Sequence, residues 1–236
     1  MSSNLKQHAA RPQTAAIIVA AGSSNRMGWD KLTAELGGKP VIWHTLTAFE
    51  RCDAIDEIVL VAREERRSAL SALIASCGFT KLHGVVVGGA TRQQSVYAGA
   101  CACSRESRLL CIHDGARPLV RDAVIRAALE AATTHGAATA AIPLKDTVKR
   151  VENGLVVETP DRATLFAIQT PQAFDRALYL RAYRAASADY SDDCQLIEAI
   201  GEPVVLSPGD AHNIKLTTPE DFLIAEAFLK ERGAAV

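Results

Sequence analysis

Short apolar runs rich in Val, Ile and Leu alternate along this chain with segments of helical length, and this alternation restricts the fold more than any other feature. The strand candidates are Ala15–Ala20, Glu57–Val61, Gly84–Val87, Leu109–His113 and Ala138–Ile142. The helix candidates between them are Val41–Cys52, Glu64–Cys77, Thr91–Ser104 and Asp122–His135. Strands that are apolar without alternation are typical of a sheet covered on both faces. The pattern predicts an α/β fold with a mostly parallel, twisted sheet and helices on both faces.

The segment from Lys145 to about residue 172 interrupts this pattern. Thr147–Val151 and Leu155–Glu158 are short, charged runs joined by Glu152-Asn153-Gly154, and Asn-Gly between two strands indicates a hairpin. We therefore expect a protruding β-arm at about residues 145–172. A two-stranded arm cannot bury its own face, so a second copy of the chain is its simplest partner.

The remaining elements complete one domain. We expect a return strand at Phe166–Ile168, helices near Asp175–Ala186 and Asp192–Ile200, a strand at Pro203–Leu206 and a last helix that begins at Thr218-Pro219. The predicted organisation is a disordered lead-in over residues 1–13 and a single domain over residues 14–236.

Composition excludes several classes of protein. The 236 residues carry 26 Lys plus Arg against 27 Asp plus Glu, so no global charge attracts nucleic acid. The longest apolar run is about seven residues, far short of the ~20 that a membrane helix needs. Six cysteines include no CxxC pair, so we expect reduced, mostly buried thiols in a cytoplasmic protein.

The segment from Ala15 to Lys31 indicates a phosphate-binding loop. Its apolar strand ends at Gly22, whose missing Cβ lets the backbone approach a ligand. Ser23, Ser24 and Asn25 follow with short donors, and Arg26 and Lys31 add two cations five residues apart that suit a triphosphate. An ordinary turn with solvated cations explains the same residues. Neither the P-loop nor the G-x-G-x-x-G pattern is present.

Other strand ends carry polar residues. Asp114 follows the strand Leu109–His113, where a carboxylate can hold Mg²⁺ or a ribose hydroxyl, or can instead cap the turn and pair with Arg117. His113 reads as a packed strand residue. Gly88-Gly89 followed by Thr91 to Ser95 can present N–H groups to a base, ribose or phosphate, or form a loop with Thr91 as helix cap. Lys215, Arg162 and Thr170 are weak signals by themselves.

Taken in order, these segments resemble the 2-C-methyl-D-erythritol 4-phosphate cytidylyltransferase (IspD) family. The resemblance spans about Thr14 to Leu229. It is carried by Ala20-Ala21-Gly22-Ser23-Ser24-Asn25-Arg26-Met27, Lys31, Gly88-Gly89, Thr91-Arg92, Ser95-Val96, His113-Asp114-Gly115-Ala116-Arg117-Pro118, Lys145-Asp146-Thr147-Val148-Lys149, Asp161-Arg162, Gln169-Thr170-Pro171-Gln172, Ser191-Asp192-Asp193 and Asn213-Ile214-Lys215.

The resemblance implies a Rossmann-like nucleotidyltransferase fold and a homodimer built by the arm. It implies transfer of a cytidylyl group from CTP to 2-C-methyl-D-erythritol 4-phosphate, with release of pyrophosphate, as a step of non-mevalonate isoprenoid biosynthesis. It also implies Mg²⁺ or another divalent cation, with Asp114 as its protein ligand.

The same resemblance assigns residue roles. Arg26 and Lys31 match the family's catalytic, transition-state-stabilising positions. Arg162 and Lys215 match positions that recognise the sugar phosphate, with Arg162 reaching into the neighbouring subunit's site. The implied substrate-binding residues are Ala20, Ala21, Gly22, Ser23, Ser24, Gly89, Ser95, Asp114, Gly115, Arg117, Arg162, Thr170, Ser191 and Lys215.

The chain departs from the family pattern at two places. Trp29-Asp30 precedes Lys31 where a Pro or small residue is common, and His212 precedes Asn213 where an acid can occur, so we expect no second metal carboxylate. Two other functions remain open from the sequence: a cytidylyltransferase for another polyol phosphate such as ribitol 5-phosphate, and a regulatory nucleotide-binding domain without turnover.

Overall fold

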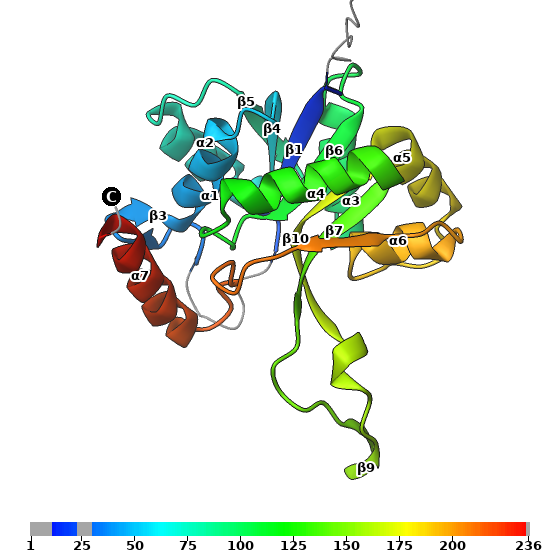
Figure 1. Ribbon diagram of the computed structural model, residues 1–236. Coiled ribbons are helices and arrows are strands. Elements are labelled where there is room, and N and C mark those ends of the chain that lie inside the picture. Colours follow the sequence, from blue (N-terminus) through cyan, green and yellow to red (C-terminus); the bar gives the residue numbers. More distant parts are fainter. Residues whose placement is uncertain (1–10, 23–29, 235–236) are drawn as a thin grey trace, which may run out of the picture.

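The computed structural model describes residues 11–22 and 30–234. Seven strands form one sheet in the order β11-β7-β10-β6-β1-β4-β5 (Figure 1). These strands are β1 Thr14–Val19, β4 Glu57–Ala62, β5 Leu82–Val87, β6 Leu109–Asp114, β7 Ala137–Pro143, β10 Phe166–Asp175 and β11 Val205–Pro208. Two further pairs are β2 Glu35–Leu36 with β3 Lys39–Pro40, and β8 Arg150–Glu152 with β9 Leu155–Glu158.

The helices follow the predicted order. They are α1 Val41–Arg51, α2 Glu64–Ala75, α3 Arg92–Ala102, α4 Asp122–His135, α5 Arg176–Ala185, α6 Asp193–Ala199 and α7 Pro219–Ala234, with a short 3-10 helix η1 at Arg162–Thr164. No helix in the described ranges has the length and apolarity required to cross a bilayer.

The sheet is mostly parallel, as predicted. Strand β1 pairs in parallel with β4 and β6, β4 with β5, and β7 with β11. Only β10 among these seven strands runs antiparallel to its neighbours, β6 and β7. The carboxyl ends of β1, β4, β5 and β6 therefore meet at one edge, which is where an α/β sheet binds ligands.

Strand β1 supplies both hydrophobic cores because its successive side chains point to opposite faces. Ala16 and Ile18 pack in the core with residues of α1, α4 and α7, whereas Ala15 and Ile17 pack in the core with residues of α3, α5 and α6. Figure 1 shows α4 crossing one face of the sheet while α3 lies behind it. All four β1 residues are fully buried, which is why this strand reads as one continuous apolar run.

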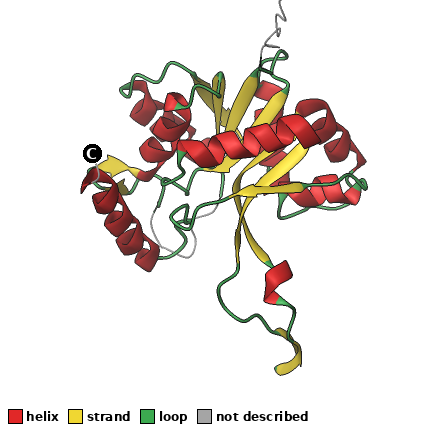
Figure 2. Ribbon diagram, in the orientation of Figure 1, coloured by secondary structure: helices red, strands yellow, loops and turns green. Residues whose placement is uncertain are grey.

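The hairpin predicted from Asn153-Gly154 is present between β8 and β9. Asn153 has φ of +51° and Gly154 has φ of +80°, which is the left-handed pair that a tight hairpin turn requires. The arm hangs away from the sheet (Figure 2). It leaves Val151, Leu155 and Val156 between 52% and 71% exposed. The arm thus presents an apolar surface that its own two strands do not bury.

The structure differs from the sequence prediction at two boundaries. Residues 166–172, expected in the arm, lie in β10, because the chain from Phe166 pairs with β7 and from Gln172 also with β6. Residues 11–13, expected in a disordered lead-in, are held on the domain. Arg11 forms an ion pair with Asp56 at 2.7 Å, and the Gln13 carbonyl accepts from the Arg108 and Leu109 amides.

Candidate active site

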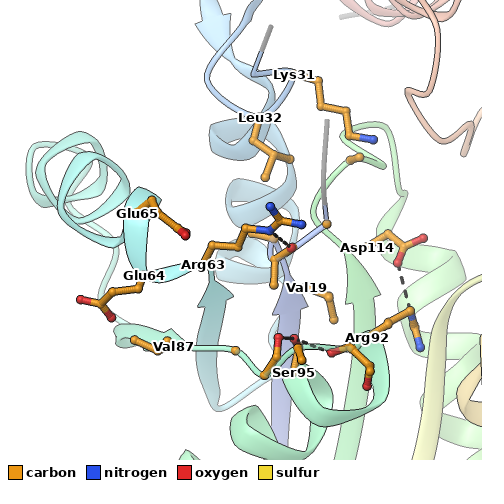
Figure 3. A pocket seen from close by; sticks show the side chains of 18 of the residues that line it. Val19, Lys31, Leu32, Arg63, Glu64, Glu65, Val87, Arg92, Ser95 and Asp114 are labelled. Atoms are coloured by element: carbon orange, nitrogen blue, oxygen red, sulfur yellow. Dashed lines mark hydrogen bonds and ion pairs between the residues drawn. The ribbon is translucent and has the colours of Figure 1, made fainter. Parts of the chain in front are cut away.

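One cavity of about 560 Å³ opens at the carboxyl edge of the sheet (Figure 3). Its wall comes from the carboxyl ends of β1, β5 and β6, from the segments that follow β1, β4, β5 and β6, and from Lys215 in the segment before α7. The lining residues are Val19, Ala20, Ala21, Gly22, Lys31, Leu32, Arg63, Glu64, Glu65, Val87, Gly88, Gly89, Ala90, Thr91, Arg92, Ser95, Asp114, Ala116 and Lys215. Its size is in the range of ligand-binding clefts.

Eight predicted site residues line this cavity. They are Ala20, Ala21, Gly22, Lys31, Gly89, Ser95, Asp114 and Lys215. Arg26, Ser23 and Ser24, which the sequence also assigned to the site, lie outside the described residues. The sequence therefore predicted residues from separate strand ends that the fold brings to one cavity.

Asp114 lies among three cations at the end of β6. Its Oδ2 is 2.9 Å from Lys215 Nζ and 3.6 Å from Arg117 Nε, and its Oδ1 is 3.8 Å from an Arg92 terminal nitrogen. Burial alone would raise the pKa of Asp114, but the charges of Lys215, Arg92 and Arg117 outweigh burial and hold this pKa well below its ordinary value. Asp114 is thus ionised throughout the neutral pH range.

A buried hydrogen-bond chain fixes the backbone at Asp114. The Asp114 amide donates to Thr170 Oγ1 at 3.0 Å, and this hydroxyl lies 3.1 Å from His113 Nδ1. His113 Nε2 lies 3.1 Å from the Arg117 carbonyl, so Nε2 carries the proton and Nδ1 accepts from Thr170. Fully buried His113 is therefore a neutral packing residue, as the sequence indicated.

Lys215 and Lys31 reach the surroundings of Asp114 from segments that are distant in the sequence. Asn213 Nδ2 donates to the Thr170 carbonyl at 2.7 Å, and Arg117 donates to the Asn213 carbonyl at 2.8 Å, which fixes the loop that carries Lys215. Lys31 Nζ donates to the carbonyl of Leu216, the next residue, at 3.0 Å. Lys31, Lys215 and Asp114 therefore converge at one end of the cavity.

The glycines of the cavity have two different roles. Among the residues that the structure describes, no atom lies within 4 Å of the position of a Cβ on Gly22, so none of them requires a glycine there. A Cβ on Gly88 would lie 2.6 Å from Ser95 Oγ, and one on Gly89 would lie 2.4 Å from Gln94 Cβ, so both are needed for close packing against α3. Thr91 is the helix cap that the sequence offered as an alternative, because its hydroxyl accepts from the Gln94 amide.

Five predicted site residues do not line the cavity. Gly115, Arg117 and Thr170 lie behind Asp114; the Gly115 amide donates to the Val19 carbonyl, and its carbonyl accepts from Thr45. Ser191 is exposed before α6 and its hydroxyl donates to Gln195. Arg162 is exposed on the arm and donates to the Lys145 carbonyl at 2.7 Å.

Comparison with known proteins identifies the family to which this chain belongs. The family model for IspD, 2-C-methyl-D-erythritol 4-phosphate cytidylyltransferase, matches residues 14–231. The chain belongs to this family. It is therefore an enzyme of the nucleotidyltransferase class, and the α/β fold predicted from the sequence is the fold of its relatives.

Relatives in the IspD family match over nearly their whole length. The 2-C-methyl-D-erythritol 4-phosphate cytidylyltransferase of Geobacillus kaustophilus is 48% identical over 225 residues, covering 93% of this chain and 98% of the relative. That of Desulforamulus reducens is 45% identical over 225 residues, covering 92% and 96%. The solved 4-diphosphocytidyl-2C-methyl-D-erythritol synthase of Anaerococcus prevotii is 34% identical with a TM-score of 0.83, covering 92% of this chain and 98% of that chain.

Sequence reasoning did not assign Arg92 and Arg63 to the site, although both line the cavity. Arg92 begins α3 after β5, and Arg63 directly follows β4, where its Nε donates to the Ala21 carbonyl at 2.8 Å. The strand-end rule that selected Asp114 would have selected both.

His113 predicts a pH dependence of stability. Burial lowers the pKa of His113 from 6.5 to about 4, so the unfolded chain takes up a proton in this window while the folded chain does not. Folding stability should therefore fall as the pH drops below about 6.5, by about 2 kcal/mol at pH 5 from this group. The free energy of unfolding, measured with urea, should differ less between pH 7.5 and pH 5 in His113→Gln than in wild type. His135→Gln, which replaces an exposed histidine of α4, is the control. If the unfolding free energy changed equally between the two pH values in wild type and His113→Gln, His113 would not be the cause.

Proposed function

We propose that this chain transfers a cytidylyl group from CTP to 2-C-methyl-D-erythritol 4-phosphate in the cavity described above, as a step of non-mevalonate isoprenoid biosynthesis. The observation that carries the proposal is the convergence of Lys31, Lys215 and Asp114 in a cavity that Gly88 and Gly89 also line. The cationic end suits a triphosphate and a second phosphate, and the Gly88–Gly89 end suits a base and ribose.

The reaction needs charge stabilisation rather than a base. A phosphate monoester is largely dianionic at neutral pH, so the acceptor oxygen is already a nucleophile. It attacks the α-phosphorus of CTP, a new P–O bond forms, the bond from the α-phosphorus to the bridging oxygen breaks, and pyrophosphate leaves with the electron pair. Two anions must approach each other, which makes positioning and charge neutralisation the main sources of rate.

Each cation has a proposed part. Lys31 binds triphosphate oxygens and stabilises the charge that develops at the α-phosphorus, and the family resemblance gives Arg26 the same role. Lys215 holds the acceptor phosphate for in-line attack. Asp114 offsets the positive charge around it and, through the 2.9 Å contact, fixes the Lys215 ammonium.

The site fits a divalent cation that arrives with the nucleotide. Within the described ranges no three His, Cys, Asp or Glu side chains form a metal-binding group. The Asp114 Oδ1 contact with Arg92 is long, at 3.8 Å. Mg²⁺ commonly takes one or two carboxylates and completes its shell with phosphates and water. Asp114 would be its protein ligand, and the ion would neutralise charge on the triphosphate.

This arrangement predicts that Mg²⁺ binding depends on CTP. Three cations around Asp114 oppose a bare divalent ion, so titration calorimetry of Mg²⁺ into nucleotide-free protein should show no saturable binding at millimolar ion. With a non-hydrolysable CTP analogue bound, the same titration should show saturable Mg²⁺ binding, because the phosphates then supply most of the ligands. Tight Mg²⁺ binding without nucleotide would contradict the proposed ligand set.

We further propose a cytoplasmic homodimer whose arm completes the partner's site. The exposed apolar residues of the arm and its exposed Arg162 support this, since the arm projects away from the sheet (Figure 1). Four of the cysteines are buried free thiols, which suits a reducing compartment. The arm would bury Val151, Leu155 and Val156 against the second copy and bring Arg162 to the acceptor phosphate there.

A pyrophosphate-release assay tests the function. CTP, UTP, ATP and GTP should each be combined with 2-C-methyl-D-erythritol 4-phosphate and, separately, with ribitol 5-phosphate. We expect release only with CTP and the methylerythritol acceptor. Release with ribitol 5-phosphate would reassign the acceptor, and CTP binding without release would indicate a regulatory nucleotide-binding domain.

A further inference from the structure

A row of four side chains runs from the cavity into the packing between helices. Arg92 lies between two carboxylates, with one terminal nitrogen 2.5 Å from Asp193 Oδ2 and the other 3.8 Å from Asp114 Oδ1. Tyr179 donates its hydroxyl to the other oxygen of Asp193 at 3.1 Å. The row joins the end of β6 to the starts of α3 and α6 and to α5. Figure 3 shows the Arg92 side chain directed toward Asp114.

Only the cavity end of this row can meet a substrate. Arg92 and Asp114 line the cavity, whereas the Asp193 side chain is 1% exposed and Tyr179 is fully buried. Burial raises the pKa of Asp193 and the charge of Arg92 opposes this rise. A buried carboxylate is strongly disfavoured unless a cation accompanies it, and Arg92 is the cation that accompanies Asp193.

The position of Arg92 within its own helix also needs an explanation. A cation in the first turn of a helix is opposed by the positive end of the helix dipole. Local helix preference therefore does not place an arginine at the start of α3. The two carboxylates that the tertiary structure brings to this point do.

We propose that Arg92 is a positioning residue for the cytidylyl transfer: anchored by Asp193, it orients the Asp114 carboxylate and thereby sets the place of Lys215. The planar guanidinium presents one terminal nitrogen to each carboxylate, an arrangement that the single ammonium of a lysine reproduces only in part. Asp114 also contacts Lys215. A change in the orientation of the Asp114 carboxylate therefore displaces the Lys215 ammonium, which holds the acceptor. The inference rests on the proposed function, since its readout is turnover.

Turnover and nucleotide binding should be measured for Arg92→Met, Arg92→Lys, Asp193→Asn and the double variant Arg92→Met/Asp193→Asn. Arg181→Met is the matched control, because Arg181 pairs with Glu202 next to the same helices without contacting Asp114. Loss of outer partners of a functional carboxylate typically costs 10–100-fold. We expect kcat to fall roughly 100-fold in Arg92→Met and roughly tenfold in Asp193→Asn, with an unchanged Kd for CTP.

The double variant tests whether Asp193 acts through Arg92. If Asp193 acts through Arg92, adding Asp193→Asn to Arg92→Met lowers kcat no further, and Arg92→Lys recovers part of the loss. Should Arg92→Met not fold, Asp193→Asn and Arg92→Lys still give the comparison, with Tyr179→Phe as the mildest change to the same row.

Three results would overturn the inference. They are wild-type kcat in folded Arg92→Met, additive losses in the double variant, or a higher Kd for CTP at unchanged kcat, which would make Arg92 a direct ligand. Normal turnover by wild type and Arg181→Met shows that the proposed function stands. Their inactivity would instead count against the function itself.

Discussion

Lys31→Ala is expected to lower kcat by roughly 10²–10³-fold in a properly folded protein, the loss typical of a removed transition-state donor. Lys31 lines the cavity and its Nζ lies 3.0 Å from the Leu216 carbonyl, beside Lys215 and Asp114. Charge on the α-phosphorus increases as the acceptor attacks, so this ammonium stabilises the transition state more than bound CTP. Steady-state kinetics should therefore show a much larger change in kcat than in the KM for CTP.

Lys39→Ala is the matched control for that variant. Lys39 lies in the neighbouring β2–β3 hairpin, where it is exposed and its Nζ is 5.6 Å from the Trp43 ring centroid. It does not line the cavity, so its loss should leave kcat unchanged. Thermal unfolding of both variants checks their folding. Wild-type turnover in Lys31→Ala would remove Lys31 from the mechanism.

Arg162→Ala is expected to raise the KM for the sugar phosphate roughly 10–100-fold, the effect of one lost charge-assisted contact to a phosphate. Kcat at saturating acceptor should change less, because the contact serves the ground state and the transition state alike. Lys149→Ala is a matched control from the same arm, since Lys149 is exposed and donates to Thr159.

Mixed dimers test whether Arg162 acts across the interface. A subunit with Lys31→Ala and one with Arg162→Ala are each impaired alone. In a mixed dimer, a crossing arm gives one site both an intact Lys31 and an intact Arg162. Random mixing of equal amounts should then restore about a quarter of wild-type activity, measured at low acceptor concentration. If mixing restores nothing, Arg162 does not serve the neighbouring site.

Much of the fold was readable from local sequence. The helix predicted at Asp122–His135 is α4, with the same bounds, because an apolar stripe and a following glycine define it. The strands β1, β4, β5, β6 and β7 were found within one or two residues. Four of them, β1, β4, β6 and β7, are largely buried, and a strand buried on both faces is one apolar run. The Asn153-Gly154 turn was found because few residue pairs accept its backbone angles.

Strand β10 was only partly predicted from the local sequence. Its first residues were predicted as a strand, but the stretch from Gln169 to Gln172 is polar and contains a proline. Gln169, Thr170 and Gln172 are nevertheless buried, because they bond to partners in other segments, such as Asn213, Asp114 and Asp192. A polar strand of this kind is stable only once those partners are in place.

Local sequence patterns were enough to mark the strand ends, and so to predict Gly22, Gly89 and Asp114 as parts of one site. Which charges meet there could not be read from those patterns. Lys215 comes to Asp114, and Arg92 joins Asp114 to Asp193, by contacts between segments far apart in the chain. The physical reason is that backbone geometry is set by near neighbours, whereas an ion pair depends on how two whole elements pack.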